Sequence, residues 1–277
     1  MNAILPSKPR KTCALEPYRR LSSSTGVSTD NTPPLSTSPH EKQNIVESTN
    51  ETYNRLVDKL HHKLQDLYPH QKYWVAIAGG PGSGKTTSAM TIAHRINTRC
   101  DRSVAIVIPM DGFHYAREEL MAQYGGPDAL RRRGAPWTID ANAIYQKLQE
   151  IRQFGRADLP TYSRKESNPV LDGVHVEMHH RILLVEGLYL LHTRDPAWAP
   201  LDEFWDERWF VLAPSRDIQI ERLLNRRLQT WSFSKAEQWG TGREGAEKLV
   251  RFNDVKNMDL VEYCVERADE VIVTVSD

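Results

Sequence analysis

The sequence contains few cysteines: Cys13, Cys100 and Cys264 are the three present in 277 residues. They have no paired spacing, which excludes a readable disulfide framework or zinc ribbon and favours a reducing compartment. Long apolar runs are also missing, because no stretch approaches the ~18 residues that a membrane span needs. The N-terminus lacks the apolar segment of a secretory signal. We therefore expect a soluble protein with no membrane partner.

An excess of charge of either sign is missing as well, since 36 basic residues balance 36 acidic ones. This balance argues against nucleic acid as the main partner, because nucleic-acid-binding domains are usually strongly basic. We expect a cytoplasmic protein. A mitochondrial location is the alternative, because the basic, serine-rich start has some features of a transit peptide, although Glu16 and three early prolines disfavour an amphipathic helix there.

The chain divides by composition into three parts. Residues 22–40, "SSSTGVSTDNTPPLSTSPH", have almost no core-forming side chains, so we predict a disordered tail over residues 1–44. Apolar residues then recur at steps of three and four, which predicts a leading helix within residues 45–72. Residues 73–277 alternate short aliphatic runs with helical patterns. This alternation predicts an α/β domain with a parallel sheet covered by helices on both faces.

Five aliphatic runs are the expected strands: "YWVAIAG", "SVAIVIPMD", "RILLVEG", "RWFVLA" and "EVIVTV". Helices are expected over residues 85–97, 140–154, 215–228 and 243–267. Residues 155–180 contain two prolines and the turn sequence "LDG". We expect a loop and hairpin there, forming a small flap beside the sheet.

The segment "GGPGSGKT" at residues 79–86 matches the Walker A phosphate-binding loop and falls between a predicted strand and a predicted helix. Glycines let backbone N–H groups wrap around phosphates, and the helix N-terminus adds positive partial charge. Lys85 is expected to reach the outer phosphates of ATP, and the Thr86 hydroxyl to bind Mg²⁺. The predicted nucleotide-binding residues are Gly79, Gly80, Pro81, Gly82, Ser83, Gly84, Lys85, Thr86 and Thr87.

An acid ends each of two predicted strands: Asp111 closes "AIVIPMD" and Glu186 closes "RILLVE". The carboxyl ends of parallel strands face the ligand site, so both acids should approach the phosphate loop. We assign Glu186 to the metal. Asp111 is the expected general base, because aromatic and hydrogen-bonding residues suited to a small-molecule pocket follow it. A helix N-cap is the structural alternative for Asp111.

Several motifs together resemble the phosphoribulokinase/uridine kinase family over about residues 73–277: "GGPGSGKTT", "PMDGFH", "RRRGAPWTID", "PTYSR", "LLVEGLYLL" and "IERLLNRR". The resemblance implies a P-loop NTPase-type fold, ATP and Mg²⁺ as cofactors, Asp111 as catalytic base and Glu186 near the metal. It also implies a helical lid whose Arg222, Arg226 and Arg227 approach the phosphates. Dimers are common in this family, so a homodimer is a further expectation.

The acceptor site is less specific in sequence. We predict that His114, Tyr115, Arg133, Tyr162 and Arg164 contact the acceptor. "PTYSR" ends in Arg164 where the similar pantothenate kinase element has His, and His114 stands where uridine kinases have Tyr. Arg131, Arg132 and Arg133 could form a solvated run or a clamp for an anionic group. The arginines at 222 and 226 could equally form ion pairs on the helix.

The expected function is an ATP-dependent kinase that transfers the γ-phosphate to a hydroxyl of a small molecule, such as a nucleoside, a pantothenate-like acid or a sugar. The alternatives are a nucleotide-hydrolysing ATPase or GTPase switch and an inactive binding protein. No NKxD guanine-recognition sequence is present, which disfavours a GTPase.

Overall fold

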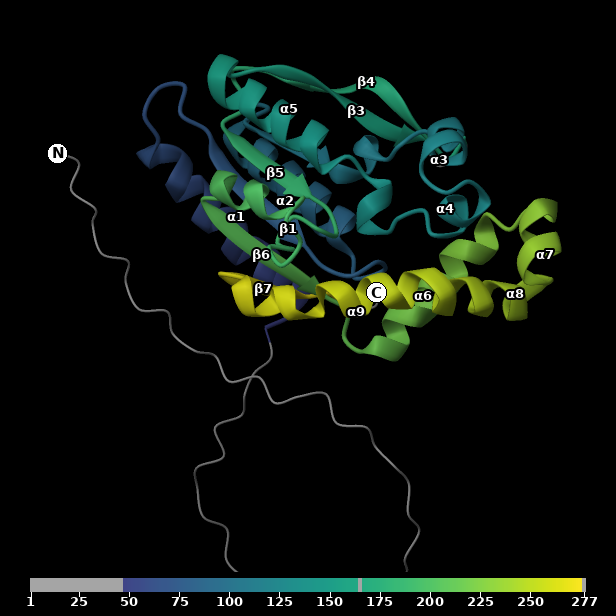
Figure 1. Ribbon diagram of the computed structural model, residues 1–277. Helices are drawn as coiled ribbons and strands as arrows, with labels where there is room; N and C mark the ends of the chain where they lie inside the picture. The colour runs from purple at the N-terminus through teal and green to yellow at the C-terminus, as the bar shows by residue number, and fades with distance from the viewer. Residues whose placement is uncertain (1–46, 164–165, 276–277) are drawn as a thin grey trace, which may run out of the picture. The chain divides into compact units, whose positions relative to one another are not determined.

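The computed structural model describes residues 47–163 and 166–275 (Figure 1). The predicted tail over residues 1–44, the transit-peptide segment and Arg164 lie outside these residues. Within them, no helix is both long enough and apolar enough to cross a bilayer.

The leading helix is α1, Thr49–Asp66. It begins with a capping box, in which Ser48 and Glu51 satisfy each other's backbone N–H groups. Its buried apolar residues, Tyr53, Leu56, Val57 and Leu60, recur at helical spacing and form the face that packs on the rest of the domain. The predicted helix is confirmed.

A parallel sheet of five strands forms the centre of the domain. Its strands are β1 (Tyr73–Ala78), β2 (Ala105–Pro109), β5 (Ile182–Glu186), β6 (Glu207–Leu212) and β7 (Glu270–Val273). They lie in the order β2-β5-β1-β6-β7, and each neighbouring pair is parallel. All five aliphatic runs of the sequence are therefore strands. Since β5 lies between β1 and β2, the ends of these three strands are adjacent.

Helices cover both faces of the sheet, as predicted. On one face, α1 and α2 (Lys85–Cys100) pack against Val75, Leu184 and Trp209 from three strands. On the other, α5 (Ala141–Phe154) and η3 (Ala199–Phe204) pack with the opposite sides of the same strands. Because every central strand is buried on both faces, each is almost continuously apolar.

The segment after β2 begins with the short 3₁₀ turn η1 (Met110–Phe113). Three more short helices follow it: α3 (Arg117–Gln123), α4 (Pro127–Arg131) and η2 (Pro136–Thr138). The predicted hairpin then forms from β3 (Ala157–Ser163) and β4 (Asn168–Val176), which pair antiparallel. It packs closely on η1: a Cβ on Gly112 would lie 2.1 Å from the carbonyl oxygen of Pro160. Only glycine fits between the turn and the hairpin.

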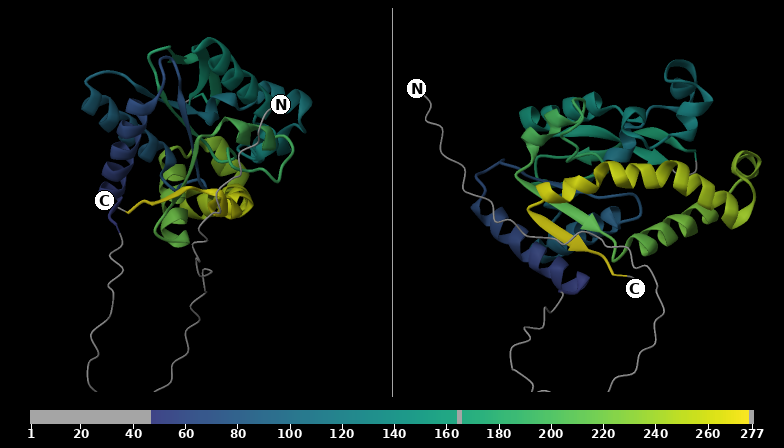
Figure 2. Two further views of the ribbon diagram at one scale, coloured as in Figure 1. Left: turned by 90° about the vertical axis from the view of Figure 1, so that its left-hand side faces the viewer. Right: turned by 60° about the horizontal axis from the view of Figure 1, so that its bottom comes forward.

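The C-terminal helices are α6 (Arg216–Gln229), α7 (Phe233–Trp239), α8 (Gly242–Leu249), the π turn η4 (Val250–Asp254), α9 (Val255–Val261) and η5 (Glu262–Arg267). The last four form one continuous stretch, seen as a long yellow helix in the right-hand view of Figure 2. The helix predicted over residues 243–267 is therefore confirmed, with a π turn inside it. In Figure 1, α6 to α8 and the pair α3 and α4 lie beyond the carboxyl ends of the central strands.

Candidate active site

The phosphate-binding loop joins β1 to α2, as the sequence predicts. Gly82 has φ of 78° and Gly84, the N-cap of α2, has φ of 102°. This left-handed conformation favours glycine and turns the loop so that it wraps around the helix N-terminus. Gln219 of α6 supports the loop from outside, because its Nε2 donates to the carbonyl of Pro81 at 2.8 Å.

Lys85 lies at the centre of the candidate site. Its side chain is buried, and Nζ donates to the carbonyl of Gly80 at 3.0 Å. Burial lowers the pKa of Lys85, while Glu186 and Asp111 act to raise it and Arg226 to lower it. These interactions indicate that the two predicted acids and one predicted arginine all approach this ammonium group.

Thr86 and Glu186 form a pair of oxygen ligands. The Thr86 hydroxyl donates to Glu186 Oε1 at 2.9 Å. Thr86 is exposed, whereas Glu186 is buried at the end of β5, in register with Ile77 of β1. Mg²⁺ takes oxygen ligands from one or two protein groups together with nucleotide phosphates, so this pair suits it. Within residues 47–163 and 166–275, no cluster of three His, Cys, Asp or Glu side chains could hold a metal on its own.

Asp111 follows β2 directly, within η1, and is half-buried. Since Pro109 of β2 is in register with Glu186 of β5, the two acids stand at the ends of neighbouring strands. The Asp111 side chain caps no helix, so the structural alternative for this residue is not observed. Its backbone carbonyl instead accepts a hydrogen bond from Nδ1 of His114 at 2.8 Å, which directs the His114 ring.

Three of the predicted acceptor residues form one cluster, defined by His114, Arg133 and Tyr162. The rings of His114 and Tyr162 lie 5.1 Å apart. Arg133 Nε donates to the Tyr162 hydroxyl at 3.2 Å, with its guanidinium carbon 5.6 Å from the ring centre. Tyr162 comes from the hairpin, so the flap contributes directly to this acceptor cluster. Tyr115 instead stacks on Tyr124, at 4.4 Å between ring centres.

The predicted lid arginines of α6 contact different groups. Arg226 approaches Lys85, but the Arg222 guanidinium donates to Thr274 Oγ1 at 2.8 Å and to the carbonyl of Val275 at 3.2 Å. Arg227 forms a bidentate pair with Asp254 of the π turn, at 2.8 Å for the closer contact. Of the three arginines predicted to approach the phosphates, Arg226 acts on Lys85. Arg222 instead reaches the loop through Thr274, whose hydroxyl donates to the carbonyl of Ser83 at 2.8 Å.

The π turn supplies contacts that the sequence did not assign. Asn253 Nδ2 donates to the carbonyl of Arg133 at 2.7 Å, and Asn257 Nδ2 to that of Gly134 at 3.1 Å. Arg132 donates in return to Asn253 Oδ1 at 3.0 Å. These bonds fix the backbone that carries Arg133. The partners are more than a hundred residues apart, so no local sequence signal could have paired them.

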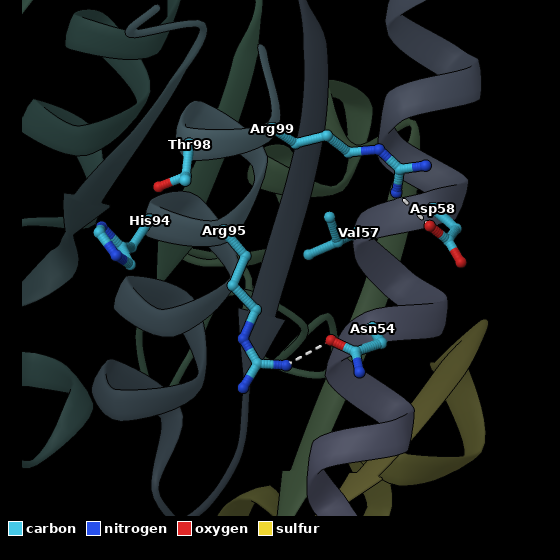
Figure 3. Close-up of a pocket in the computed structure, with 7 residues that line it drawn as sticks. All are labelled: Asn54, Val57, Asp58, His94, Arg95, Thr98 and Arg99. Carbon is cyan, nitrogen blue, oxygen red and sulfur yellow. Dashed lines mark hydrogen bonds and ion pairs between the residues drawn. The ribbon is translucent and has the colours of Figure 1, made fainter. Parts of the chain in front are cut away.

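A separate cavity of about 360 Å³ lies between α1 and α2, away from the phosphate loop (Figure 3). Arg95 donates to Asn54 Oδ1 at 2.6 Å, and Arg99 pairs with Asp58. Four of its polar side chains therefore already have partners. Its lining includes one acid, Asp58, but no lysine and no glycine loop of the kind that phosphate chemistry requires.

The geometry of the loop, the two strand-end acids and the lid agrees with comparisons to known proteins. The model of the phosphoribulokinase/uridine kinase family matches residues 74–272. The chain belongs to this family. A provisionally named uridine kinase of Schizosaccharomyces pombe is 33% identical over 230 residues, covering 82% of this chain and 91% of that protein.

Two solved structures are also similar to this chain. A provisionally named fructose transport system kinase of Silicibacter sp. has a TM-score of 0.64 and 26% identity, covering 78% of this chain and 98% of that one. YFH7 of Saccharomyces cerevisiae, described as a P-loop kinase with a circular permutation, has a TM-score of 0.67 and 18% identity, covering 83% and 99%. At that identity YFH7 supports the fold alone. Family and relatives together identify a P-loop, ATP-dependent kinase.

Proposed function

We propose that this kinase transfers the γ-phosphate of ATP to a hydroxyl of a small molecule, with Asp111 as general base. The observation that carries the proposal is the position of Asp111 and Glu186 at the ends of neighbouring strands, both acting on the buried Lys85. Transfer to an alcohol requires one acid that binds the metal and a second acid that is available to accept the hydroxyl proton. Glu186 suits the first role, and Asp111 suits the second because its side chain caps no helix.

Each group then has one task. The glycine loop and Lys85 would hold the outer phosphates, and Thr86 and Glu186 would hold Mg²⁺, which would supply positive charge to neutralise the phosphates. Asp111 takes the proton of the attacking hydroxyl. Arg226 reaches the same region from α6 and is proposed to neutralise charge on the transferring group. Positioning and charge neutralisation supply most of the rate.

The acceptor lies, in this proposal, between Asp111 and the acceptor cluster, under the β3–β4 hairpin. The close packing of Gly112 on Pro160 supports it, because this contact joins the hairpin to the turn that carries the base. The names of the relatives point to a nucleoside in one case and a sugar in the other. Nucleosides, pantothenate-like acids and sugars therefore stay the classes to test. Tyr115 and Arg222 are given no part in the reaction.

The test is ADP formation from Mg·ATP with and without a panel of these acceptors. The proposal expects ADP formation to depend on one of the acceptors, with one phosphate transferred to it for each ADP formed. Equal ADP formation with and without every acceptor would instead indicate a nucleotide-hydrolysing switch. A homodimer remains a prediction, testable by the molar mass of the protein in solution.

A further inference from the structure

The buried guanidinium of Arg133 has two nitrogens without a hydrogen-bond partner among the described residues. Its Nη1 and Nη2 are inaccessible to solvent and make no hydrogen bond with any residue that the structure describes. Only Nε is bonded, to the Tyr162 hydroxyl. The terminal nitrogens of this guanidinium thus have no counter-ion in the described protein.

Such an arrangement is costly unless a ligand completes it. A guanidinium is always charged and presents its donors in a planar fork. Burying a charge without a partner is strongly unfavourable, and folded proteins usually pair such groups. The neighbouring Arg132 shows the usual solution, because its nitrogens bond Phe252, Asn253 and Asn257. Arg133 differs because its two terminal nitrogens have no hydrogen-bond partner among the described residues.

The surrounding contacts hold this fork in place. Tyr162 binds Nε and lies against the guanidinium, and Asn253 binds the backbone carbonyl of Arg133. An arginine fixed through Nε and backbone, with both terminal nitrogens unused, has the donor geometry for bidentate binding of an oxyanion. Because these nitrogens are shielded from solvent, the atoms that cover them must move aside when the oxyanion binds.

Its position indicates which substrate carries that oxyanion. Arg133 and Asp111 both act on the ring of His114, so the fork lies on the side of the proposed base that the acceptor would occupy. Arg226, and not Arg133, is the arginine that acts on Lys85 of the phosphate loop. The donor phosphates therefore have their own arginine.

We propose that Arg133 is the specificity-determining residue for an anionic acceptor, binding a carboxylate or phosphate group on the molecule whose hydroxyl approaches Asp111. This inference rests on the proposed function and narrows it, since it disfavours neutral nucleosides and neutral sugars.

Matched acceptor pairs test the proposal in the wild-type enzyme with Mg·ATP. The pairs are glycerate and glycerol, pantothenate and pantothenol, and ribulose 5-phosphate and ribulose, with uridine as a neutral nucleoside. We expect an anionic member to be phosphorylated with kcat/KM at least about 10- to 100-fold above its neutral twin, the range for hydrogen bonds to charged groups. Preference for uridine or for a neutral twin would overturn the proposal.

The variant Arg133→Met then tests whether the preference for anionic acceptors comes from Arg133. It should raise the KM of the anionic acceptor about 10- to 100-fold and leave the KM of ATP within about twofold. Arg131→Met is the matched control, because Arg131 is exposed and pairs with Asp128. An increase in the KM of ATP larger than that for the acceptor would assign Arg133 to the donor and overturn the proposal.

A binding measurement separates this inference from the kinase proposal. The loop is first saturated with Mg·ADP, and thermal stabilisation by inorganic phosphate is then compared in wild type, Arg133→Met and Arg131→Met. Stabilisation that is lost only in Arg133→Met supports the anion site, even if no acceptor is phosphorylated and the kinase proposal fails. Equal stabilisation of all three proteins, or none in wild type, contradicts the site.

Discussion

The donor and acceptor halves of the candidate site differ in how they treat charge. Around the phosphate loop, Lys85 has a protein partner and lies near two acids, and Thr86 binds Glu186. One polar atom there, Ser83 Oγ, is buried without a partner, but it is neutral. In the acceptor cluster, Arg133 carries a full charge without a counter-ion among the described residues. The donor half is thus preformed, whereas the acceptor half needs a ligand to complete it.

Asp111→Asn should show the largest effect. The amide keeps the size of the side chain but cannot accept the proton, so kcat should fall about 10²- to 10⁴-fold. The dissociation constant of Mg·ATP should change far less than kcat, although Asp111 also acts on Lys85. Steady-state kinetics and calorimetric titration measure the two quantities. Asp128→Asn, at an exposed position, is the control. Normal turnover in Asp111→Asn would remove this residue from the mechanism.

Lys85→Ala should damage the donor half instead. Loss of the ammonium group should weaken Mg·ATP binding on the order of 100-fold, the upper range for a hydrogen bond to a charged group. Phosphate binding to the acceptor half should persist, because Arg133 is unchanged. Titration with nucleotide and with inorganic phosphate tests both statements. Lys248→Ala, at an exposed position of α8, provides a control. Unaltered nucleotide affinity would contradict the assigned cradle.

Asp254→Asn should affect the connection between the halves. Asp254 is buried and pairs with Arg227 of α6, while its neighbour Asn253 binds the backbone of Arg133. Breaking a buried pair costs about 3–5 kcal/mol, and the part-exposed Arg227 should reduce this to about 2 kcal/mol. Urea unfolding measures the change. A loss below about 0.5 kcal/mol, the size of a surface effect, would show that the pair does not join the two elements.

Arg133→Met should stabilise the protein in the absence of ligands. The variant loses the bond to Tyr162 but removes an unpaired buried charge, and functional sites often carry such a cost in stability. We expect a gain of about 1 kcal/mol in the free energy of unfolding, since replacing buried charges by apolar groups can stabilise by roughly 1–4 kcal/mol. Thermal unfolding of ligand-free protein checks the sign. Clear destabilisation would mean that the described protein already neutralises this guanidinium.

The smallest expected effect is the pH dependence contributed by His114. Burial lowers its pKa from the ordinary value of 6.5. The unfolded chain therefore binds a proton that the folded protein resists, and stability should fall as the pH drops below about 6.5. His114→Asn should remove up to about 1 kcal/mol of this loss between about pH 6.5 and 5.5. Denaturant unfolding at several pH values measures the slope, and an unchanged slope would exclude His114 as a source.

The donor half of the site could be predicted from the sequence, whereas most of the acceptor half could not. The strands, the phosphate loop and Glu186 were predictable, because their function depends on residue types at short, fixed spacing. The acceptor half is assembled from η1, the Arg133 loop, the hairpin and the π turn, whose contacts join distant residues. The short helices α3 and α4 were missed, since Pro and Gly residues interrupt any helical periodicity over residues 114–138.

The two α6 arginines illustrate the limit of helical spacing. Arg222 and Arg226 are four residues apart and share a face, as predicted. One turn of helix nevertheless separates them by about 6 Å along the axis. That distance is enough for one to reach Thr274 and the other the phosphate loop. Spacing specified the face of the helix but not which groups lie opposite each residue.

The π turn at residues 250–254 sets the rotation of the helical residues that follow it. Asn253 and Asp254 lie within the turn and Asn257 lies just after it, and each binds a different part of the site. Straightening the π turn into a regular α-helix without removing a residue would rotate everything after it by up to about 100°. Asn257 and Met258 would then turn away from the groups they contact. Substitutions that straighten the π turn should therefore be tolerated far less than substitutions on the exposed side of this helix.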